Sequence, residues 1–206
     1  MSANRSSLGI IGLSGSFSTP SKTRALAEEA VRRAVVRFEQ TSEVYDLGQF
    51  GAELGLARSF ADLGEEARQI VDNIVRAKAL VIASPVYKGS YPGLFKHLFD
   101  LIDPAWLAGK PILLAATGGG EKHALIIEHQ LRPLFAFFEA QTLATGVYVS
   151  ERDFVEGRLA NKSVLDRLDR AVEQFAPYLR EPRQQERGFA PVSHLRLHQE
   201  AVAAGF

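Results

Sequence analysis

Residues 15–23 read Gly-Ser-Phe-Ser-Thr-Pro-Ser-Lys-Thr and gather five hydroxyl side chains and one lysine between an apolar run and a helical pattern. The segment matches neither the Gly-x4-Gly-Lys-Ser/Thr loop of nucleotide hydrolases nor the Gly-x-Gly-x-x-Gly turn of dinucleotide-binding domains. What remains is a helix N-terminus, where backbone N–H groups, hydroxyl groups and the helix dipole bind an anion. We therefore predict a phosphate-binding loop, with an ordinary helix cap formed by Ser21 or Thr23 as the alternative.

A second candidate loop, residues 84–93, places two prolines and two glycines around two tyrosines. Such a backbone is stiff and leaves N–H groups exposed, which suits the polar edge of a flavin ring, and Tyr87 would supply an aromatic wall. The alternative is a purely structural loop, in which the prolines begin a helix at Gly93 and the tyrosines fill gaps.

The third candidate loop is Thr117 followed by three consecutive glycines. Such a run loses conformational entropy on folding unless the backbone must approach another group closely or adopt a positive φ. A planar ring lying against the backbone is one reason for it, and a flexible joint between strand and helix is the alternative. Together, the three loops indicate a site for flavin mononucleotide (FMN), with its phosphate at residues 15–23.

Five short apolar runs, which lack strict alternation, predict strands buried on both faces; they are residues 8–13, 44–47, 79–83, 111–116 and 143–149. Helical spacing predicts helices at residues 25–38, 63–77, 93–102, 122–140 and 163–179. Regular alternation of strand and helix predicts an α/β protein. We expect a flavodoxin-like three-layer sandwich, with a five-stranded parallel sheet in the order 2-1-3-4-5 and helices on both faces.

Ligands of such sheets bind outside the carboxyl ends of the strands, at the switch point between strands 1 and 3. Residues 14–23, 84–93 and 117–121 follow the first, third and fourth predicted strands. All three candidate loops should therefore meet at one edge of the sheet.

The length of 206 residues suggests one domain, residues 1–180, followed by a C-terminal extension, residues 181–206, which we expect to act as an oligomerisation arm. Residues 181–188 are charged and punctuated by proline and glycine, and residues 192–202 carry a short helical pattern. Residues 130–141 hold more large apolar side chains than one helix face buries, so we expect a homodimer or homotetramer.

Composition excludes several classes of protein. Twenty-four basic residues balance 24 acidic ones, which argues against a purely electrostatic partner such as nucleic acid or an anionic membrane. The absence of cysteine excludes thiolate chemistry and iron–sulfur clusters, so redox chemistry requires a bound cofactor. No signal peptide and no apolar run of roughly 20 residues is present, so a cytoplasmic protein without membrane contact is expected.

Metal and nucleophile chemistry also lack a pattern. His123 and His129 have no partner at His-x-x-x-His spacing, and no Gly-x-Ser-x-Gly elbow is present, so we predict neither a metal site nor a catalytic triad. Lys96 and Asp100 are four positions apart on a predicted helix and should form an exposed ion pair.

The motifs Leu13-Ser-Gly-Ser16 with Pro20-Ser-Lys22, and Pro85-Val-Tyr-Lys88 followed by Ser90-Tyr-Pro-Gly-Leu-Phe-Lys96, resemble the NAD(P)H-dependent FMN reductases of the flavodoxin-like superfamily. Residues 115–133 resemble more narrowly the reductases of two-component alkanesulfonate and methanesulfonate monooxygenase systems, the methanesulfonate type most of all.

This resemblance implies an enzyme that transfers hydride from NADH or NADPH to FMN and releases the reduced flavin to a separate monooxygenase, which cleaves carbon–sulfur bonds with oxygen. It implies no general acid or base, because the flavin carries the chemistry. The implied phosphate ligands are Ser14, Ser16, Ser21, Lys22 and Thr23. The implied ring contacts are Pro85, Val86, Tyr87 and Lys88 on one side and Thr117, Gly118, Gly119 and Gly120 on the other.

Two further positions follow from the resemblance. His129 occupies the place where these reductases carry an inserted residue, which forms a π-bulge at a tetramer interface; the alternative is an interface histidine without a role in flavin exchange. Ser18 stands where many relatives have arginine, so the cationic contact to the phosphate would come from Lys22, with Arg24.

Three other functions remain open from the sequence. The first is a quinone or azo reductase that keeps FMN bound, the second is a flavodoxin-like electron carrier, and the third is a flavin sensor without catalytic activity. The zero net charge argues against the carrier, because flavodoxin-like carriers are usually strongly acidic.

Overall fold

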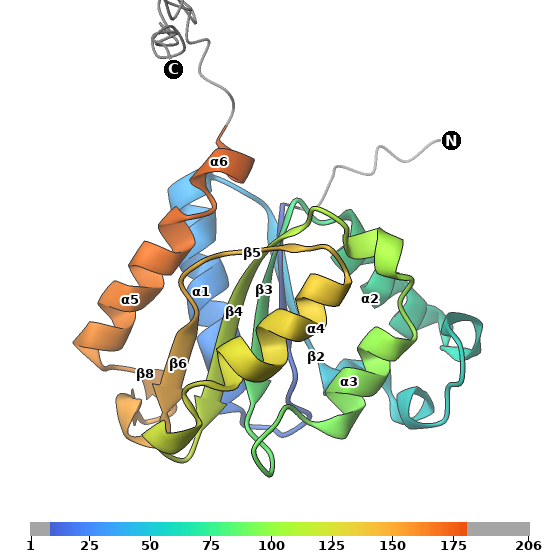
Figure 1. The fold of residues 1–206 in the computed structure, drawn as a ribbon, viewed down its shortest axis with the longest axis horizontal. Helices are drawn as coiled ribbons and strands as arrows, with labels where there is room; N and C mark the ends of the chain where they lie inside the picture. The colour runs from blue at the N-terminus through green and yellow to red at the C-terminus, as the bar shows by residue number, and fades with distance from the viewer. Residues whose placement is uncertain (1–8, 181–206) are drawn as a thin grey trace, which may run out of the picture.

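The three central strands are the most deeply buried elements of the computed structural model, which describes residues 9–180 (Figure 1). They are β1 (Ile10–Ser14), β3 (Ala79–Pro85) and β4 (Pro111–Gly118), and every residue of β1 and β3 is buried. Residues 181–206, with their helical pattern at 192–202, lie outside the described residues, as do residues 1–8, of which only residue 8 belongs to the first predicted strand.

The main sheet has six strands, and all of its pairings are parallel. Its order is β2 (Ser42–Asp46), β1, β3, β4, β5 (Gln141–Thr142), while β6 (Val147–Ser150) also pairs with β4. This arrangement confirms the predicted order 2-1-3-4-5, and it places the ends of β1, β3 and β4 side by side.

The predicted fifth strand at residues 143–149 is wrong in its bounds, because β5 ends at Thr142, before the predicted range, and β6 begins only at Val147. Between β5 and β6, the backbone carbonyl groups accept hydrogen bonds from two arginine side chains. Arg132 donates to the carbonyls of Leu143 and Ala144 at 3.0 and 3.4 Å, and Arg167 donates to that of Gly146 at 2.7 Å. The N–H of Leu143 still donates to the carbonyl of Ile112 on β4 at 2.8 Å, so the pairing with β4 is interrupted only at residues 144–146.

Helices cover both faces of the sheet, as predicted (Figure 1). Alternate strand residues divide the core into two clusters, so that on β3 Leu80 and Ile82 face one cluster and Val81 faces the other. The first cluster includes α2 (Glu65–Arg76), α3 (Gly93–Asp100) and α4 (Arg132–Phe137). The second includes α1 (Lys22–Phe38), α5 (Lys162–Glu173) and α6 (Ala176–Leu179).

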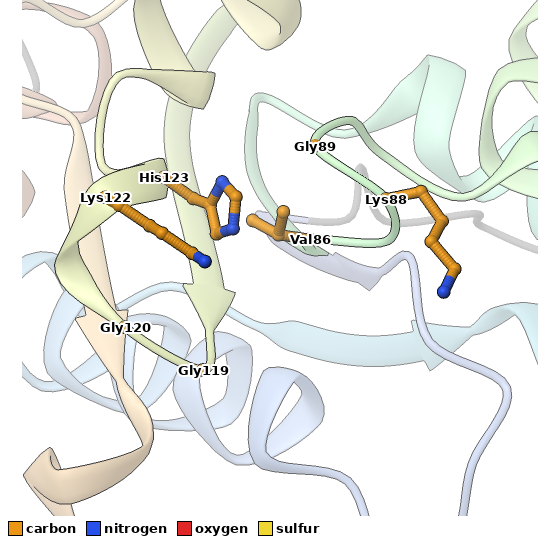
Figure 2. A pocket seen from close by; sticks show the side chains of 7 residues that line it. All are labelled: Val86, Lys88, Gly89, Gly119, Gly120, Lys122 and His123. Carbon is orange, nitrogen blue, oxygen red and sulfur yellow. The ribbon is translucent and has the colours of Figure 1, made fainter.

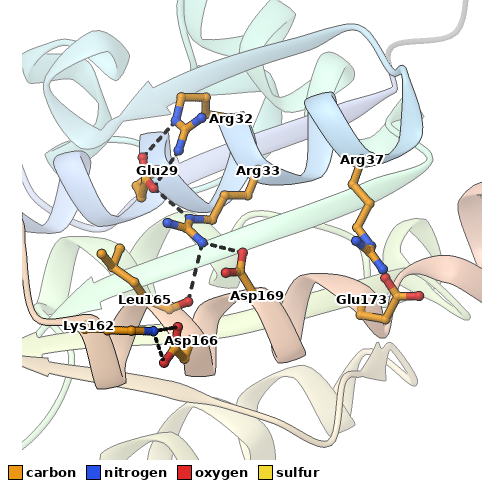
Figure 3. A network of polar contacts seen from close by, with 9 residues as sticks. All are labelled: Glu29, Arg32, Arg33, Arg37, Lys162, Leu165, Asp166, Asp169 and Glu173. Carbon is orange, nitrogen blue, oxygen red and sulfur yellow. Dashed lines mark hydrogen bonds and ion pairs between the residues drawn. The ribbon is translucent and has the colours of Figure 1, made fainter.

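A polar network crosses the outer seam between α1 and α5 (Figure 3). Arg33 binds Glu29 at 2.7 Å and also pairs with Asp169, while Arg37 pairs with Glu173. Ion pairs with exposed partners contribute about 0 to 1 kcal/mol each, so the network orients α5 more than it stabilises the fold.

The predicted helix at residues 122–140 is interrupted. It consists of the 3-10 turn η5 (Glu121–His123), the π-helical turn η6 (Ile127–Leu131) and α4. The N–H of Arg132 donates to the carbonyl of Ile127, five residues earlier. Pro133 explains the interruption, because proline has no N–H and its ring collides with the carbonyl four residues before it, here that of His129.

Pro177 ends the predicted helix 163–179 in the same way, since α5 stops at Glu173 and α6 begins at Ala176. The remaining elements are short: η1 (Leu47–Phe50), η2 (Ala52–Gly55), η3 (Phe60–Asp62), η4 (Pro104–Leu107), η7 (Glu151–Asp153), β7 (Phe154–Val155) and β8 (Arg158–Leu159). Lys96 and Asp100 form the expected ion pair on α3. Within residues 9–180, no helix is both long and apolar enough to cross a membrane.

Candidate active site

The three candidate loops meet at the carboxyl edge of the sheet. The N–H of Gly15 donates to the carbonyl of Ala83 at 2.7 Å, and the N–H of Val86 donates to that of Thr117 at 2.8 Å. The hydroxyl oxygens of Thr23 and Thr117 lie 2.6 Å apart in a buried hydrogen bond. Each loop is therefore held by another, and together they form one surface.

Three hydroxyl groups in and beside the phosphate-binding loop support its backbone. Ser14 Oγ accepts from the N–H of Ser16, and Ser16 Oγ accepts from that of Ser18, at 3.3 and 3.2 Å. Ser21 is the N-cap of α1 and accepts from the N–H of Arg24 at 3.2 Å. The helix-cap alternative is thus realised for Ser21, and the same cap places the N-terminus of α1 at the loop.

The two basic residues of this segment have different partners. Arg24 binds Glu28 at 2.8 Å and also pairs with Asp46 at the end of β2. Lys22 pairs with Glu151, the first residue of η7. Arg24 is therefore held beside β2, whereas Lys22 reaches towards the opposite side of the loop.

The second loop, residues 84–93, contains a tight turn at residues 87–90. Tyr87 and Ser90 exchange backbone hydrogen bonds of 2.7 and 3.1 Å, with Lys88 and Gly89 at φ 52° and 87° between them. Pro85 is the last residue of β3 and is buried. Tyr87 is 42% exposed and packs edge to face on Phe17, with ring centroids 6.3 Å apart. The sequence did not predict this contact for Phe17. An aromatic residue within an otherwise polar loop was the feature that could have indicated it.

A hollow of about 510 Å³ lies between the second and third loops. Figure 2 shows Val86 and His123 facing each other across it, with Lys88 and Lys122 on opposite sides. Gly89, Gly119 and Gly120 complete its lining. The candidate residues Val86, Lys88, Gly119 and Gly120 thus line one hollow, while His129 on η6 is exposed and is not part of this lining.

None of the three glycines of the third loop adopts a positive φ, and close approach to another group explains only the first of them. A Cβ on Gly118 would stand 2.3 Å from the hydroxyl of Tyr148, whereas a Cβ on Gly119 or Gly120 would meet nothing within 4 Å. Gly118 therefore makes room for Tyr148, and the next two glycines leave open backbone beside the hollow.

Tyr148 was not identified from the sequence. Its hydroxyl donates to the carbonyl of Gly120 at 2.5 Å. Burial raises the pKa of Tyr148, and the nearby Asp153 carboxylate adds to this shift. The phenol consequently keeps its proton at neutral pH and holds the third loop.

The turn η7 carries charged residues to both loops. Glu151 pairs with Lys22, and Arg152 pairs with Glu121 at the end of the glycine run. Asp153 fixes the turn, since its carboxylate accepts from the N–H and the hydroxyl of Ser150, both at 2.7 Å. Burial opposes ionisation of Asp153, but these hydrogen bonds and one from Asn161 lower its pKa.

This donor set fits FMN. Hydroxyl groups, one lysine and a helix N-terminus suit a phosphate, and open glycine backbone beside a half-exposed tyrosine suits a planar ring. A second hollow, of about 630 Å³, has Glu65 and Glu66 in its wall and is less suited to a phosphate. Among residues 9–180, no group of three or more metal-ligating side chains is assembled.

Comparison with known proteins agrees with this chemistry. The model of a family described as NADPH-dependent FMN reductase matches residues 8–154. The chain is 44% identical over 170 residues to the NADH-dependent FMN reductase SfnF of Pseudomonas fluorescens, covering 82% of this chain and 91% of that protein.

It is also 44% identical over 168 residues to an FMN reductase (NADPH) of Pseudomonas aeruginosa, covering 82% of this chain and 90% of the relative. Among solved structures, the apo form of an NADH:FMN oxidoreductase (EMOB) is similar, with a TM-score of 0.72 and 29% identity. That match covers 85% of this chain and 92% of the other.

Proposed function

The chain belongs to the NADPH-dependent FMN reductase family, and we propose that it supplies free reduced FMN to a partner monooxygenase that acts on organosulfur compounds. As a member of this family it is an NAD(P)H-dependent FMN reductase. Residues 115–133 resemble reductases of sulfonate monooxygenase systems, and this resemblance supports an organosulfur compound as the substrate of the partner.

FMN, when bound, supplies the ring that accepts hydride from the nicotinamide nucleotide. The phosphate of FMN would be held by the N-terminus of α1 together with Ser16, Ser21 and Lys22. Ser14 and Thr23 would support the loop through their hydrogen bonds to Ser16 and Thr117. Two backbone segments would hold the ring: Pro85, Val86, Tyr87 and Lys88 from one side, and Thr117, Gly118, Gly119 and Gly120 from the other. No side chain needs to act as general acid or base.

The observation that carries the supplier role is the exposure of the hollow. Lys88, Gly89, Gly119 and Lys122 in its wall are all exposed, and the hollow lies at the edge of the sheet rather than inside the core. A flavin held there leaves without opening the fold, which is what a protein that uses FMN as a substrate requires.

The test is an assay of purified protein with each flavin and each nucleotide. Colourless protein should oxidise NADH or NADPH only after FMN is added, and it should lose added FMN on gel filtration. Combined with a flavin-dependent sulfonate monooxygenase, it should support release of sulfite from a short alkanesulfonate. Yellow protein that retains FMN and prefers a quinone would contradict the supplier role and favour the quinone or azo reductase.

The same proposal includes a cytoplasmic homotetramer built from dimers, with η6 and α4 at an interface. Leu125 and Phe137, near these elements, are 63% and 72% exposed, although Leu131, Phe135 and Phe138 are buried in the core. His129 lies on the π-helical turn itself, which is where the resemblance predicts an interface residue.

A further inference from the structure

We infer that Glu151 competes with the phosphate of FMN for Lys22, and that this competition sets how readily the flavin leaves. The inference rests on the proposed function, in which FMN enters and leaves as a substrate. Its basis is the ion pair between Lys22 and Glu151, residues that are 129 positions apart in the chain.

The pair lies where a phosphate would bind. Lys22 is the first residue of α1, directly after the N-cap Ser21, and it closes the hydroxyl-rich loop. Glu151 follows the end of β6, and the preceding residue Ser150 pairs with Gly118 of β4. The carboxylate therefore reaches the first loop from the side of the third.

The backbone of Glu151 is held in place on both sides. Ser150 and Asp153 form a capping box around η7, and Asn161 donates to Asp153 at 2.6 Å. The neighbouring Arg152 pairs with Glu121. The hydrogen bonds of the turn thus fix the backbone of Glu151, and the ion pair with Lys22 places its carboxylate.

A carboxylate and a phosphate make the same demand on an ammonium group, because both are anionic oxygen acceptors. The hydrogen bond from Lys22 lowers the pKa of Glu151, so its carboxylate is ionised at neutral pH. Incoming phosphate must displace this carboxylate or bind beside a like charge. Arg24 does not relieve the competition, since Asp46 and Glu28 hold it.

The experiment compares dissociation constants for FMN and riboflavin in the wild type and Glu151→Gln, measured by quenching of flavin fluorescence without NAD(P)H. Glutamine keeps the size of the side chain and removes its charge. FMN should bind about two- to fivefold more tightly to the variant, the range of an exposed ion pair. Riboflavin, which lacks the phosphate, should bind as it does to the wild type, and stopped-flow dissociation of FMN should slow.

A matched control is Asp100→Asn, which breaks the Lys96–Asp100 pair on α3. That pair also joins a lysine to a carboxylate, and its side chains are 41% and 52% exposed against 43% and 68% for Lys22 and Glu151. The control should leave both dissociation constants unchanged. In a Lys22→Met background, Glu151→Gln should no longer tighten FMN, because the shared partner is gone.

Equal FMN affinity in Glu151→Gln and wild type would overturn the inference, as would an equal gain for riboflavin. Inorganic phosphate, used as a competitor, should displace FMN from both proteins. Wild-type protein that never releases FMN would contradict the proposed supply of free reduced FMN. That result differs from equal FMN affinity in the two proteins, which contradicts only the role of Glu151. Thermal unfolding of each variant checks that the fold is retained.

Discussion

The hydroxyl groups of Thr23 and Thr117 join the start of α1 to the end of β4. Both residues are buried, at 3% and 8% exposure, so each hydroxyl relies on the other for its hydrogen bond. The resemblance predicts that both residues lie at the flavin, and the structure adds that they hold two loops together. Each hydroxyl therefore stabilises the contact between two of the loops that we propose as the flavin site.

Thr117→Val should destabilise the protein by about 1–3 kcal/mol, because valine has the same shape but leaves the buried hydroxyl of Thr23 without a partner. Urea unfolding at neutral pH measures the change. The double variant Thr23→Val with Thr117→Val should recover part of the loss, since no polar group then remains unpaired. If Thr117→Val is as stable as the wild type, the hydrogen bond between Thr23 and Thr117 contributes nothing to the free energy of unfolding.

At the scale of elements, short irregular turns place the charged residues of the site. The turn η7 has only three residues, yet it carries Glu151 and Arg152 to two different loops. Its shape depends on Asp153, whose carboxylate caps the turn. Helical spacing located α1, α2 and α3, and apolar runs located the buried central strands, but a turn of this length has no periodicity to detect.

Asp153→Asn should destabilise the protein at pH 7, and the difference from the wild type should shrink in acid. The folded state lowers the pKa of Asp153 below its ordinary value of 3.8. A carboxyl with a depressed pKa contributes stability that is complete above the unfolded value and is lost as pH falls through the folded value. Urea unfolding of both proteins between pH 7 and pH 2.5 measures this. If the difference in stability between the two proteins does not depend on pH, the ionised carboxylate of Asp153 does not stabilise the turn.

Two prolines interrupt the predicted helices at residues 122–140 and 163–179. Pro133 follows the π-helical turn, and Pro177 lies in α6 just after the end of α5. Each removes the N–H that would continue the α-helical ladder. Apolar periodicity runs across both interruptions, which is why the sequence indicated two long helices where the structure has shorter pieces.

For the whole molecule, the two faces of the sheet differ in the apolar side chains that they leave exposed. The side with α1 and α5 carries the ion-pair network of Figure 3 and exposes the small side chain of Val36. The side with η6 and α4 exposes the larger side chain of Phe137, the last residue of α4. An exposed large apolar side chain next to an unusual helical turn favours assembly through that side.

Phe137→Ser should therefore reduce the size of the oligomer, measured by light scattering during gel filtration, because it removes apolar area from the proposed interface. Val36→Ser is the matched control: Val36 on α1 is also 72% exposed, and its loss should change nothing. His129→Ala should alter either the oligomer or the rate of FMN release. Unchanged size and unchanged release in both interface variants would remove η6 and α4 from the assembly.

The sequence by itself determined the parallel sandwich, its strand order and the three loops, because buried apolar runs, helical spacing and glycine-rich segments are local patterns. It also placed the π-helical turn at His129, through resemblance. Only the tertiary structure decided the partners of those loops. Lys22 meets Glu151, and Gly118 makes room for Tyr148, through folding that brings distant segments together. Charge pairing and close packing depend on distance in space, which no spacing along the chain encodes.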